Sequence, residues 1–276
     1  DEASRARRGG VRAFGDGLEA VGGVELNGGY ALSTRRGNPC AAATADGRVA
    51  LVRPSKTKTL VASRPKGHLF TACEWTGDGE LMVGEGESGR VSVWRAAPDR
   101  LEEVHGWDAH SYVYGAGAPA EVWCVALDEG TGLLLSGADD GRLKAWDEDT
   151  TRAALVLDHG AGVTAVVARP EENVVATGSY DETLRLWDLR KPAAPTAELK
   201  LGGGVYSLRA DGPGGYLASC MAAGVRVVRE SGCVGHYAHH GSIVYGAARF
   251  GRSIASCSFY DRAVHLWTDG NEPPVE

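Results

Sequence analysis

Serine or threonine, histidine and aspartate recur together at three places in the sequence, and these are the side chains of a catalytic triad. In each place a Trp follows the Asp by six residues. Buried polar groups need hydrogen-bond partners whether or not they do chemistry, so we interpret the recurrence first as a structural hydrogen-bonded set. The three sets are His110, Ser136, Asp140 and Trp146; His159, Thr177, Asp181 and Trp187; and His240, Ser256, Asp261 and Trp267.

The same spacing marks an internal repeat. Weaker copies run from Asp46 to Val52, from Ser88 to Trp94 and from Ala223 to Val228. The turn positions 46, 88, 140, 181, 223 and 261 are separated by 42, 52, 41, 42 and 38 residues. A period of about 40 to 45 residues is typical of WD-repeat propellers, in which each repeat forms one four-stranded blade.

The sequence therefore predicts an all-β fold, a WD-repeat β-propeller with six recognisable blades. Short β-type runs at 174–177 and 184–187 flank a polar turn, and no helical stripe competes with them. A seventh blade would belong to a complete chain or be a degenerate N-terminal one. We expect residues 1–23 to be a tail that holds a closing strand or a partial blade, and residues 24–276 to be the propeller. Because residue 1 is Asp, the chain is a candidate fragment or processed form.

Composition excludes several classes of protein. The formal net charge of -7 argues against nucleic-acid binding, and no run of 18 apolar residues predicts a membrane span. The six cysteines lack a C-x-x-C pair, so we interpret most of them as buried thiols of a reducing compartment such as the cytosol. No metal site is expected, because no Cys or acid near 236–240 completes a ligand set for the histidines there. We expect a monomer that needs no cofactor.

The second half of the chain resembles the WD-repeat diphthine methyl ester hydrolase family of the diphthamide pathway. The similarity runs in motif order from about Trp107 to Trp267. Its segments are Glu121 to Trp123, Ser136 to Asp140, Ala176 to Glu182, Leu201 to Val205, Cys220 to Met221, Val244 to Ala247, Ala255 to Asp261, and Val264 to Trp267. Ala222 stands where the family has a His after Cys-Met.

This resemblance implies a carboxylic ester hydrolase, a diphthine methylesterase of the eukaryotic cytoplasm. Its substrate would be methylated translation elongation factor 2, from which it removes the methyl ester of the diphthine intermediate. The freed carboxylate would then be amidated in an ATP-dependent step. If the family His replaced by Ala222 were catalytic, this chain would be impaired.

Propeller geometry predicts a shared rim for the candidate site. Loops that enter innermost strands and turns between second and third strands lie on one face, so carboxylates and aromatic rings should meet there. A trimethylammonium group binds to such a pairing, since ring faces and nearby carboxylates attract a cation. An ordinary solvated acidic rim is the alternative. The expected substrate-binding residues are Tyr180, Glu182, Gly202, Gly203, Gly204, Tyr245, Phe259, Tyr260, Asp261 and, from the segments of resemblance, Trp123.

The turn from Ser256 to Asp261 is one residue longer than its counterparts, and such an extra residue re-aims side chains. Ester hydrolysis needs a nucleophile with a base, or a base-activated water, together with donors for the oxyanion. Ser258 with His240 is one candidate catalytic pair, and His159 with Asp181 activating water is another. The backbone amides of Gly202 to Gly204 would stabilise the oxyanion.

A non-catalytic scaffold is the rival interpretation, because the same fold supports many unrelated functions. The tetrapeptide from Trp187 to Arg190 has the W-D-x-R form of WD-repeat proteins that dock on cullin ligase adaptors. In that case the chain would be a substrate receptor of a cullin-type ubiquitin ligase.

Overall fold

The computed structural model describes residues 9–14, 20–26, 29–34, 39–52, 60–63, 69–77, 79–97, 100–114 and 116–269. Their regular structure is β-strand apart from one 3-10 helix, η2 (Pro170–Glu172). None of the helices in this part of the chain is long and apolar enough to cross a membrane. The chain divides into unit 1, residues 1–127 and 149–151, and unit 2, residues 128–148 and 152–276.

Unit 1 contains a two-stranded sheet and two four-stranded antiparallel sheets, and it ends at β11. The two-stranded sheet is β1 (Gly9–Phe14) and β2 (Ala20–Leu26). The next is β3 (Gly29–Ser33), β4 (Cys40–Thr44), β5 (Arg48–Val52) and β6 (Leu60–Ser63). The third is β7 (Phe70–Trp75), β8 (Glu80–Glu85), β9 (Arg90–Ala96) and β10 (Leu101–Asp108).

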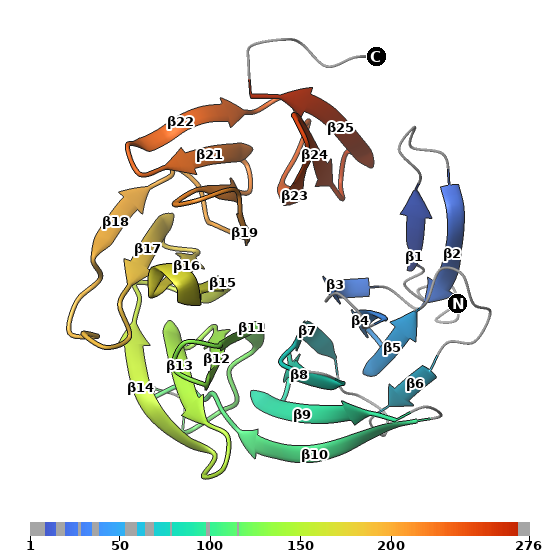
Figure 1. The fold of residues 1–276 in the computed structure, drawn as a ribbon, viewed down its shortest axis with the longest axis vertical. Helices are drawn as coiled ribbons and strands as arrows, with labels where there is room; N and C mark the ends of the chain where they lie inside the picture. The colour runs from blue at the N-terminus through green and yellow to red at the C-terminus, as the bar shows by residue number, and fades with distance from the viewer. Residues whose placement is uncertain are drawn as a thin grey trace. The chain divides into compact units, whose positions relative to one another are not determined.

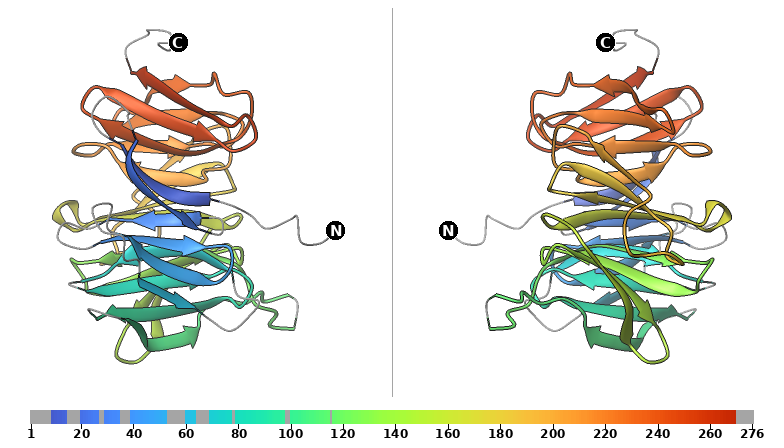
Figure 2. Two further views of the ribbon diagram at one scale, coloured as in Figure 1. Left: turned by 90° about the vertical axis from the view of Figure 1, so that its right-hand side faces the viewer. Right: turned by 90° about the vertical axis from the view of Figure 1, so that its left-hand side faces the viewer.

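Unit 2 continues the series from β12, and the unit boundary falls at the end of β11 (Val122–Asp128). The sheet that starts with β11 continues with β12 (Leu133–Ala138), β13 (Arg142–Asp147) and β14 (Arg152–Asp158). Next come β15 (Val163–Arg169), β16 (Val174–Ser179), β17 (Thr183–Trp187) and β18 (Ala197–Lys200). The following sheet is β19 (Ser207–Ala210), β20 (Tyr216–Ser219), β21 (Val225–Arg229) and β22 (Gly232–Tyr237). The last is β23 (Val244–Phe250), β24 (Ser253–Ser258) and β25 (Ala263–Thr268). Within unit 2 these sheets lie side by side in sequence order, from green to red (Figures 1 and 2).

The six predicted repeats are confirmed as six sheets of three or four strands in the described residues. Each predicted turn position lies between the second and third strands of its sheet, as position 181 does between β16 and β17. In the N-terminal segment β1 pairs with β2 in a two-stranded sheet, and β25 has only β24 as a neighbour among the described strands. A closing strand or partial blade in residues 1–23 stays a prediction. The predicted boundary between residues 23 and 24 falls inside β2.

The cysteines follow the expected burial only in part. Cys73, Cys124 and Cys220 are buried in strands or at a strand end, as predicted, whereas Cys233 and Cys257 are exposed. Both exposed cysteines lie within strands, at positions that are open to solvent. The sequence pattern therefore predicted that these cysteines lie in strands, but not whether their side chains face the core or the solvent.

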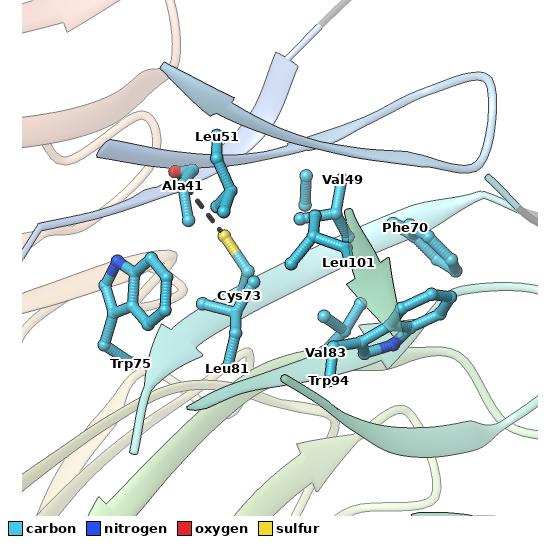
Figure 3. Close-up of a cluster of buried hydrophobic side chains, with 11 residues drawn as sticks. Ala41, Val49, Leu51, Phe70, Cys73, Trp75, Leu81, Val83, Trp94 and Leu101 are labelled. Atoms are coloured by element: carbon cyan, nitrogen blue, oxygen red, sulfur yellow. Dashed lines mark hydrogen bonds between the residues drawn. The ribbon is translucent and has the colours of Figure 1, made fainter. Parts of the chain in front are cut away.

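The core of unit 1 forms where alternate residues of β7 and β8 pack against β4 and β5 (Figure 3). Phe70 meets Trp94 edge to face, with ring centroids 6.4 Å apart. The Cys73 thiol lies 3.8 Å from the Ala41 carbonyl oxygen, and burial raises the pKa of this thiol to about 12. Aromatic rings and small residues thus fill the space between two sheets, which removes large apolar areas from water.

Neighbouring sheets in unit 2 approach so closely that one position must be glycine. A Cβ on Gly178 would stand 2.5 Å from a methyl carbon of Val205, which is closer than any packed contact. The same approach lets the hydroxyl of Thr164 donate a hydrogen bond to the carbonyl oxygen of Val205. This contact fixes the chain that leads from β18 into β19 against the middle of the preceding sheet.

A buried indole N–H anchors the third strand of three sheets in unit 2. Trp146 Nε1 donates to Ser136 Oγ at 2.8 Å, and Trp187 Nε1 donates to Thr177 Oγ1 at 3.0 Å. Trp267 Nε1 donates to Ser256 Oγ at 3.1 Å. The hydroxyl is needed because an indole N–H buried without an acceptor costs free energy.

We predict that Thr177→Val lowers the free energy of unfolding by about 2 kcal/mol or more. Valine has the shape of threonine but leaves the Trp187 N–H buried without its acceptor, which costs about 1–3 kcal/mol, and removes the hydroxyl's own hydrogen bond as well. Urea unfolding followed by tryptophan fluorescence measures the difference. Thr196→Val is the matched control, because Thr196 is exposed and its change should stay within about 0.5 kcal/mol. Equal effects at both positions would contradict this role.

Candidate functional site

His240 lies in a hydrogen-bonded chain that has the order of a catalytic triad. Its Nε2 is 2.9 Å from Ser256 Oγ, and its Nδ1 is 2.9 Å from Asp261 Oδ2. Ser256, however, is only 2% exposed and also accepts the Trp267 N–H. The chain therefore ties β24 and β25 to the loop before β23, and the Ser256 hydroxyl is already engaged by both His240 and Trp267.

His159 occupies the same place two repeats earlier in the chain but makes different hydrogen bonds. Its Nε2 is 2.9 Å from Thr177 Oγ1, while its Nδ1 lies 3.1 Å from the Leu157 carbonyl oxygen. A carbonyl can only accept, so Nδ1 carries the proton and Nε2 accepts from the threonine hydroxyl. Burial, followed by the charge of Arg185, lowers the pKa of His159 to about 4. The ring is thus neutral at pH 7.

Asp181 and Asp261 accept hydrogen bonds from backbone N–H groups of their repeats. Asp181 Oδ2 accepts the Gly160 N–H at 2.9 Å and pairs with Arg185 at 2.7 Å. Burial raises the pKa of this carboxyl, but the bonds from Arg185, Gly160 and Thr183 outweigh it and leave the pKa below its usual value. The pKa of Asp261 is likewise lowered, because bonds from Ala263 and His240 outweigh the opposing effect of burial. Each carboxylate therefore fixes its turn in ionised form.

The two predicted catalytic pairs do not form as hydrogen bonds in this structure. His240 bonds to Ser256 and not to Ser258, and His159 bonds to Leu157 and not to Asp181. Both ring nitrogens of each histidine are already engaged. The physical reason is that the repeat needs a partner for each hydroxyl that receives a tryptophan N–H, and the histidine is that partner.

The turn between β24 and β25 is the longer one that the sequence indicated. It has four residues, 259–262, where the turn between β16 and β17 has three, 180–182. In the shorter turn, Ser179 Oγ donates to the Ala161 carbonyl at 3.0 Å and accepts the Asp181 N–H at 3.1 Å. The corresponding Ser258 is 5% exposed, and its hydroxyl has no hydrogen-bond partner among the described residues. The extra residue has displaced the backbone that satisfies its counterpart.

Four aromatic rings gather beside this turn. Tyr206 and Tyr245 meet edge to face with centroids 4.8 Å apart, and Tyr245 lies 6.3 Å from Tyr260. Phe259 meets Tyr260 edge to face at 5.3 Å. Phe259 and Tyr260 are 75% and 62% exposed, so ring faces remain open to solvent. We call these four residues the aromatic cluster.

Within the aromatic cluster, Tyr245 has a perturbed phenol. Burial raises the pKa of its phenol to about 12, and a hydrogen bond with Tyr260 adds to the rise. The phenol is therefore protonated at neutral pH. It can donate a hydrogen bond to a developing oxyanion, but it cannot act as a base.

The glycines of the loop between β18 and β19 lie next to the same edge of unit 2. A Cβ on Gly204 would be 2.9 Å from the Met221 sulfur and 3.2 Å from the Tyr180 ring. Met221 bridges to Val244, whose N–H donates to the Met221 carbonyl at 3.1 Å. Tyr180, Gly204 and Met221 therefore form a continuous surface with the start of β23, which carries Tyr245.

Most predicted substrate-binding positions lie on this edge of unit 2, including Glu182 in the turn after Tyr180. Trp123 lies in β11 of unit 1, so its place in the site stays a prediction. Tyr206 and Met221 were not among the predicted site residues, because only the loop packing shows that they adjoin Tyr245 and Gly204. The described residues contain no cluster of three His, Cys, Asp or Glu side chains that could hold a metal ion.

Comparison with known proteins identifies the repeat and several relatives. The family model "WD domain, G-beta repeat" matches residues 104–147 and 153–188. The chain is 25% identical over 245 residues to "Diphthine methyltransferase homolog" of Dictyostelium discoideum, which covers 72% of this chain and 62% of the relative. It is 31% identical over 163 residues to "Diphthine methyltransferase" of Homo sapiens, which covers 54% of this chain and 34% of the relative. The chain thus spans less than two thirds of the length of these relatives.

Two further similarities concern the fold and a shorter segment. The solved WD40 β-propeller domain of Doa1 has a TM-score of 0.70 at 20% identity, over 90% of this chain and 81% of that one. A 70-residue segment is 37% identical to "DDB1- and CUL4-associated factor 11 homolog" of Caenorhabditis briggsae, covering 23% of this chain and 13% of the relative. The WD-repeat β-propeller fold is therefore confirmed, and so is the resemblance to the diphthine-modifying proteins.

We predict that His159 makes folding stability depend on pH between about 4 and 6.5. The folded-state pKa is about 4 and the reference value is 6.5, so in this range the unfolded chain binds a proton that the folded chain does not. The stabilisation is complete above pH 6.5 and is lost as the pH falls. Urea unfolding at pH 5.0 and 7.5 should show a smaller difference for His159→Gln than for the unmodified chain. His236→Gln, at an exposed histidine, should leave that difference unchanged.

Proposed function

We propose, on the premise that this WD-repeat propeller is similar to proteins named diphthine methyltransferase, that it acts in the diphthamide pathway as a diphthine methylesterase. The substrate would be methylated translation elongation factor 2 in the cytoplasm. One water would be consumed, methanol released, and a carboxylate left on the factor, ready for amidation. The names of the relatives support the pathway.

One observation carries the proposal: the aromatic cluster adjoins a buried hydroxyl, that of Ser258, which has no partner among the described residues. Tyrosine and phenylalanine faces attract a quaternary ammonium group, which cannot donate hydrogen bonds. Diphthine carries such a group next to its ester. A ring-lined cation site beside a free hydroxyl therefore matches both ends of this substrate.

Chemical roles follow from the contacts of each group. Ser258 or a water beside it would add to the ester carbonyl, and its proton would pass to the departing methoxide, which leaves as methanol; an ester formed on Ser258 would then be hydrolysed by water. Gly202 to Gly204 would offer backbone N–H groups to the oxyanion. Protonated Tyr245 would donate to the same oxygen. The histidines His159 and His240, together with Asp181 and Asp261, would hold the turns in place, because their polar atoms are already engaged.

Hydrolysis, methyl transfer and binding without chemistry would leave elongation factor 2 with different intact masses. The purified chain is incubated with methylated elongation factor 2, and the factor is weighed by mass spectrometry. Hydrolysis predicts loss of one methyl mass, transfer predicts a gain that depends on a methyl donor, and a scaffold predicts no change. A transient mass increase of this chain would identify Ser258 as a covalent nucleophile rather than a group that positions water.

We predict that Ser258→Ala lowers the rate of demethylation at least 100-fold and leaves the melting temperature unchanged or raised. The substitution removes a buried hydroxyl that bonds to nothing among the described residues, so no folding interaction is lost. Ser231→Ala, in the exposed turn after β21, is the control. An unchanged rate in Ser258→Ala would remove this residue from the chemistry.

Phe259→Ala should raise KM at least tenfold with a smaller effect on kcat, because it removes one wall of the cation site. The matched control is Phe250→Ala. Phe250 is 76% exposed and ends β23, at the opposite end of the strand from Tyr245. If both variants changed KM alike, the effect would come from lost surface area and not from the aromatic cluster.

A substrate receptor for a cullin-type ligase is the second candidate function. It is favoured by the match to a relative named for association with DDB1 and CUL4, and by the tetrapeptide that begins at Trp187. Trp187 and Leu189 are buried, whereas Arg190 is 59% exposed and pairs with Asp188 at 2.8 Å. The charged pair would thus form the docking surface.

For this candidate, Arg190→Ala should weaken co-elution with a cullin-ligase adaptor at least tenfold without changing demethylation. Arg252→Ala, at another exposed arginine, should leave co-elution as it was. Absence of binding by the unmodified chain would rule the adaptor out.

A further inference from the structure

An apolar slot lies between the sheet β15–β18 and the sheet β19–β22, with a volume of ≈ 170 Å³. Leu184, Leu186 and Leu199 line it on one side, and Tyr216 and Val228 on the other. An apolar cavity of about 150 Å³ is large enough to bind benzene. Val174 also lines the slot, and it is at the opposite end of β16 from Ser179, so the slot is separate from the aromatic cluster.

The slot exists because one sheet lacks the tryptophan of its neighbours. Val228 pairs with Tyr216 as Trp187 pairs with Val175 and Trp267 with Ile254, so Val228 holds the tryptophan position. In the next sheet, Trp267 stacks on Tyr237 of β22 with centroids 4.6 Å apart. By the same register, Leu199 of β18 stands where Tyr237 stands. Two rings are therefore replaced by a valine and a leucine, and the volume between them stays open.

The hydrogen-bond partner of the missing ring is absent as well. Ala218 pairs with Arg226 as Thr177 pairs with Arg185, so alanine holds the position of the hydroxyl that accepts an indole N–H. An indole in the slot would bury its N–H without this acceptor, at a cost of about 1–3 kcal/mol, which is fivefold or more in affinity. The slot therefore favours a phenyl ring over an indole ring.

The charged side chains that line the slot determine which residue of a bound peptide can stand next to the phenyl ring. Arg229 is paired with Asp211 at 2.7 Å, and Glu172 is paired with Arg169 at 2.7 Å. The Glu230 carboxylate has no hydrogen bond or ion pair in the part of the chain that the structure describes. An arginine or lysine beside the ring would satisfy it, and an acidic residue would be repelled.

We propose that this slot binds a phenylalanine side chain of a partner peptide segment, with an adjacent basic residue pairing with Glu230. The site adds a protein-docking function that is independent of ester hydrolysis. Its occupant is defined by three features: a phenyl-sized slot, no acceptor for an indole N–H, and an unpaired carboxylate at the mouth.

Binding of capped dipeptides to the full 276-residue chain tests this proposal. N-acetyl-Phe-Arg-amide is titrated and followed by NMR, together with the Trp-Arg and Phe-Glu analogues. We expect the Phe-Arg probe to bind at least fivefold more tightly than either analogue. No binding of Phe-Arg, or equal affinity of all three probes, overturns the proposal.

Two variants locate the binding. The double variant Val228→Trp with Ala218→Ser rebuilds the tryptophan and its acceptor, so it should raise the melting temperature and abolish probe binding. Glu230→Gln leaves the slot open and should remove the preference for Phe-Arg over Phe-Glu, which tests the site even if the double variant fails to fold. Unchanged probe affinities in both variants would show that a peptide partner is the wrong occupant. Self-association of the unmodified chain that the double variant abolishes would show the same, because a second copy of the chain would then fill the slot.

Discussion

The buried indole N–H is the constraint on which unit 2 depends. A tryptophan supplies the large apolar surface that fills the space between two sheets, but it brings a donor that must be satisfied. Ser136, Thr177 and Ser256 supply the acceptor. At Thr177 and Ser256 a histidine then bonds to that hydroxyl and so connects the sheet to the loop before it. One donor thus fixes a strand, a neighbouring strand and a loop.

This constraint determines which polar groups remain available. The histidines and aspartates that resemble a triad are engaged in the framework, so unengaged polar groups are to be sought in the turns that the framework holds. The four-residue turn after β24 shows how this happens. One inserted residue removes the backbone partners that Ser179 has in its own repeat, and Ser258 is left with a buried hydroxyl and no partner among the described residues. The scaffold is unchanged, while the turn gains a free polar group beside aromatic rings.

The repeat, the strand order and the longer turn could be predicted from the sequence, because each depends on spacing along the chain. The contacts of the candidate site could not, because they depend on which loops meet. Tyr206 belongs to the aromatic cluster only through its contact with Tyr245, a contact between a loop and a strand of different sheets. The orientation of His159 was also beyond prediction, since a carbonyl two residues away competes with Asp181 for the same proton. Likewise, nothing in residues 1–26 signalled that β1 would pair with β2.

The repeat that contains β20 and β21 lacks both the indole donor and its hydroxyl acceptor. Once Val228 replaces tryptophan, the acceptor at position 218 has no donor to satisfy, and alanine there leaves no polar group buried without a partner. The loss of the pair is therefore self-consistent, and the sheet retains its buried apolar residues while giving up volume at one edge. A repeat protein can lose one framework tryptophan because neighbouring sheets stack on both sides and keep the strand in place. In the proposed complex, the phenyl ring of the partner would occupy the volume that the absent tryptophan leaves between the two sheets.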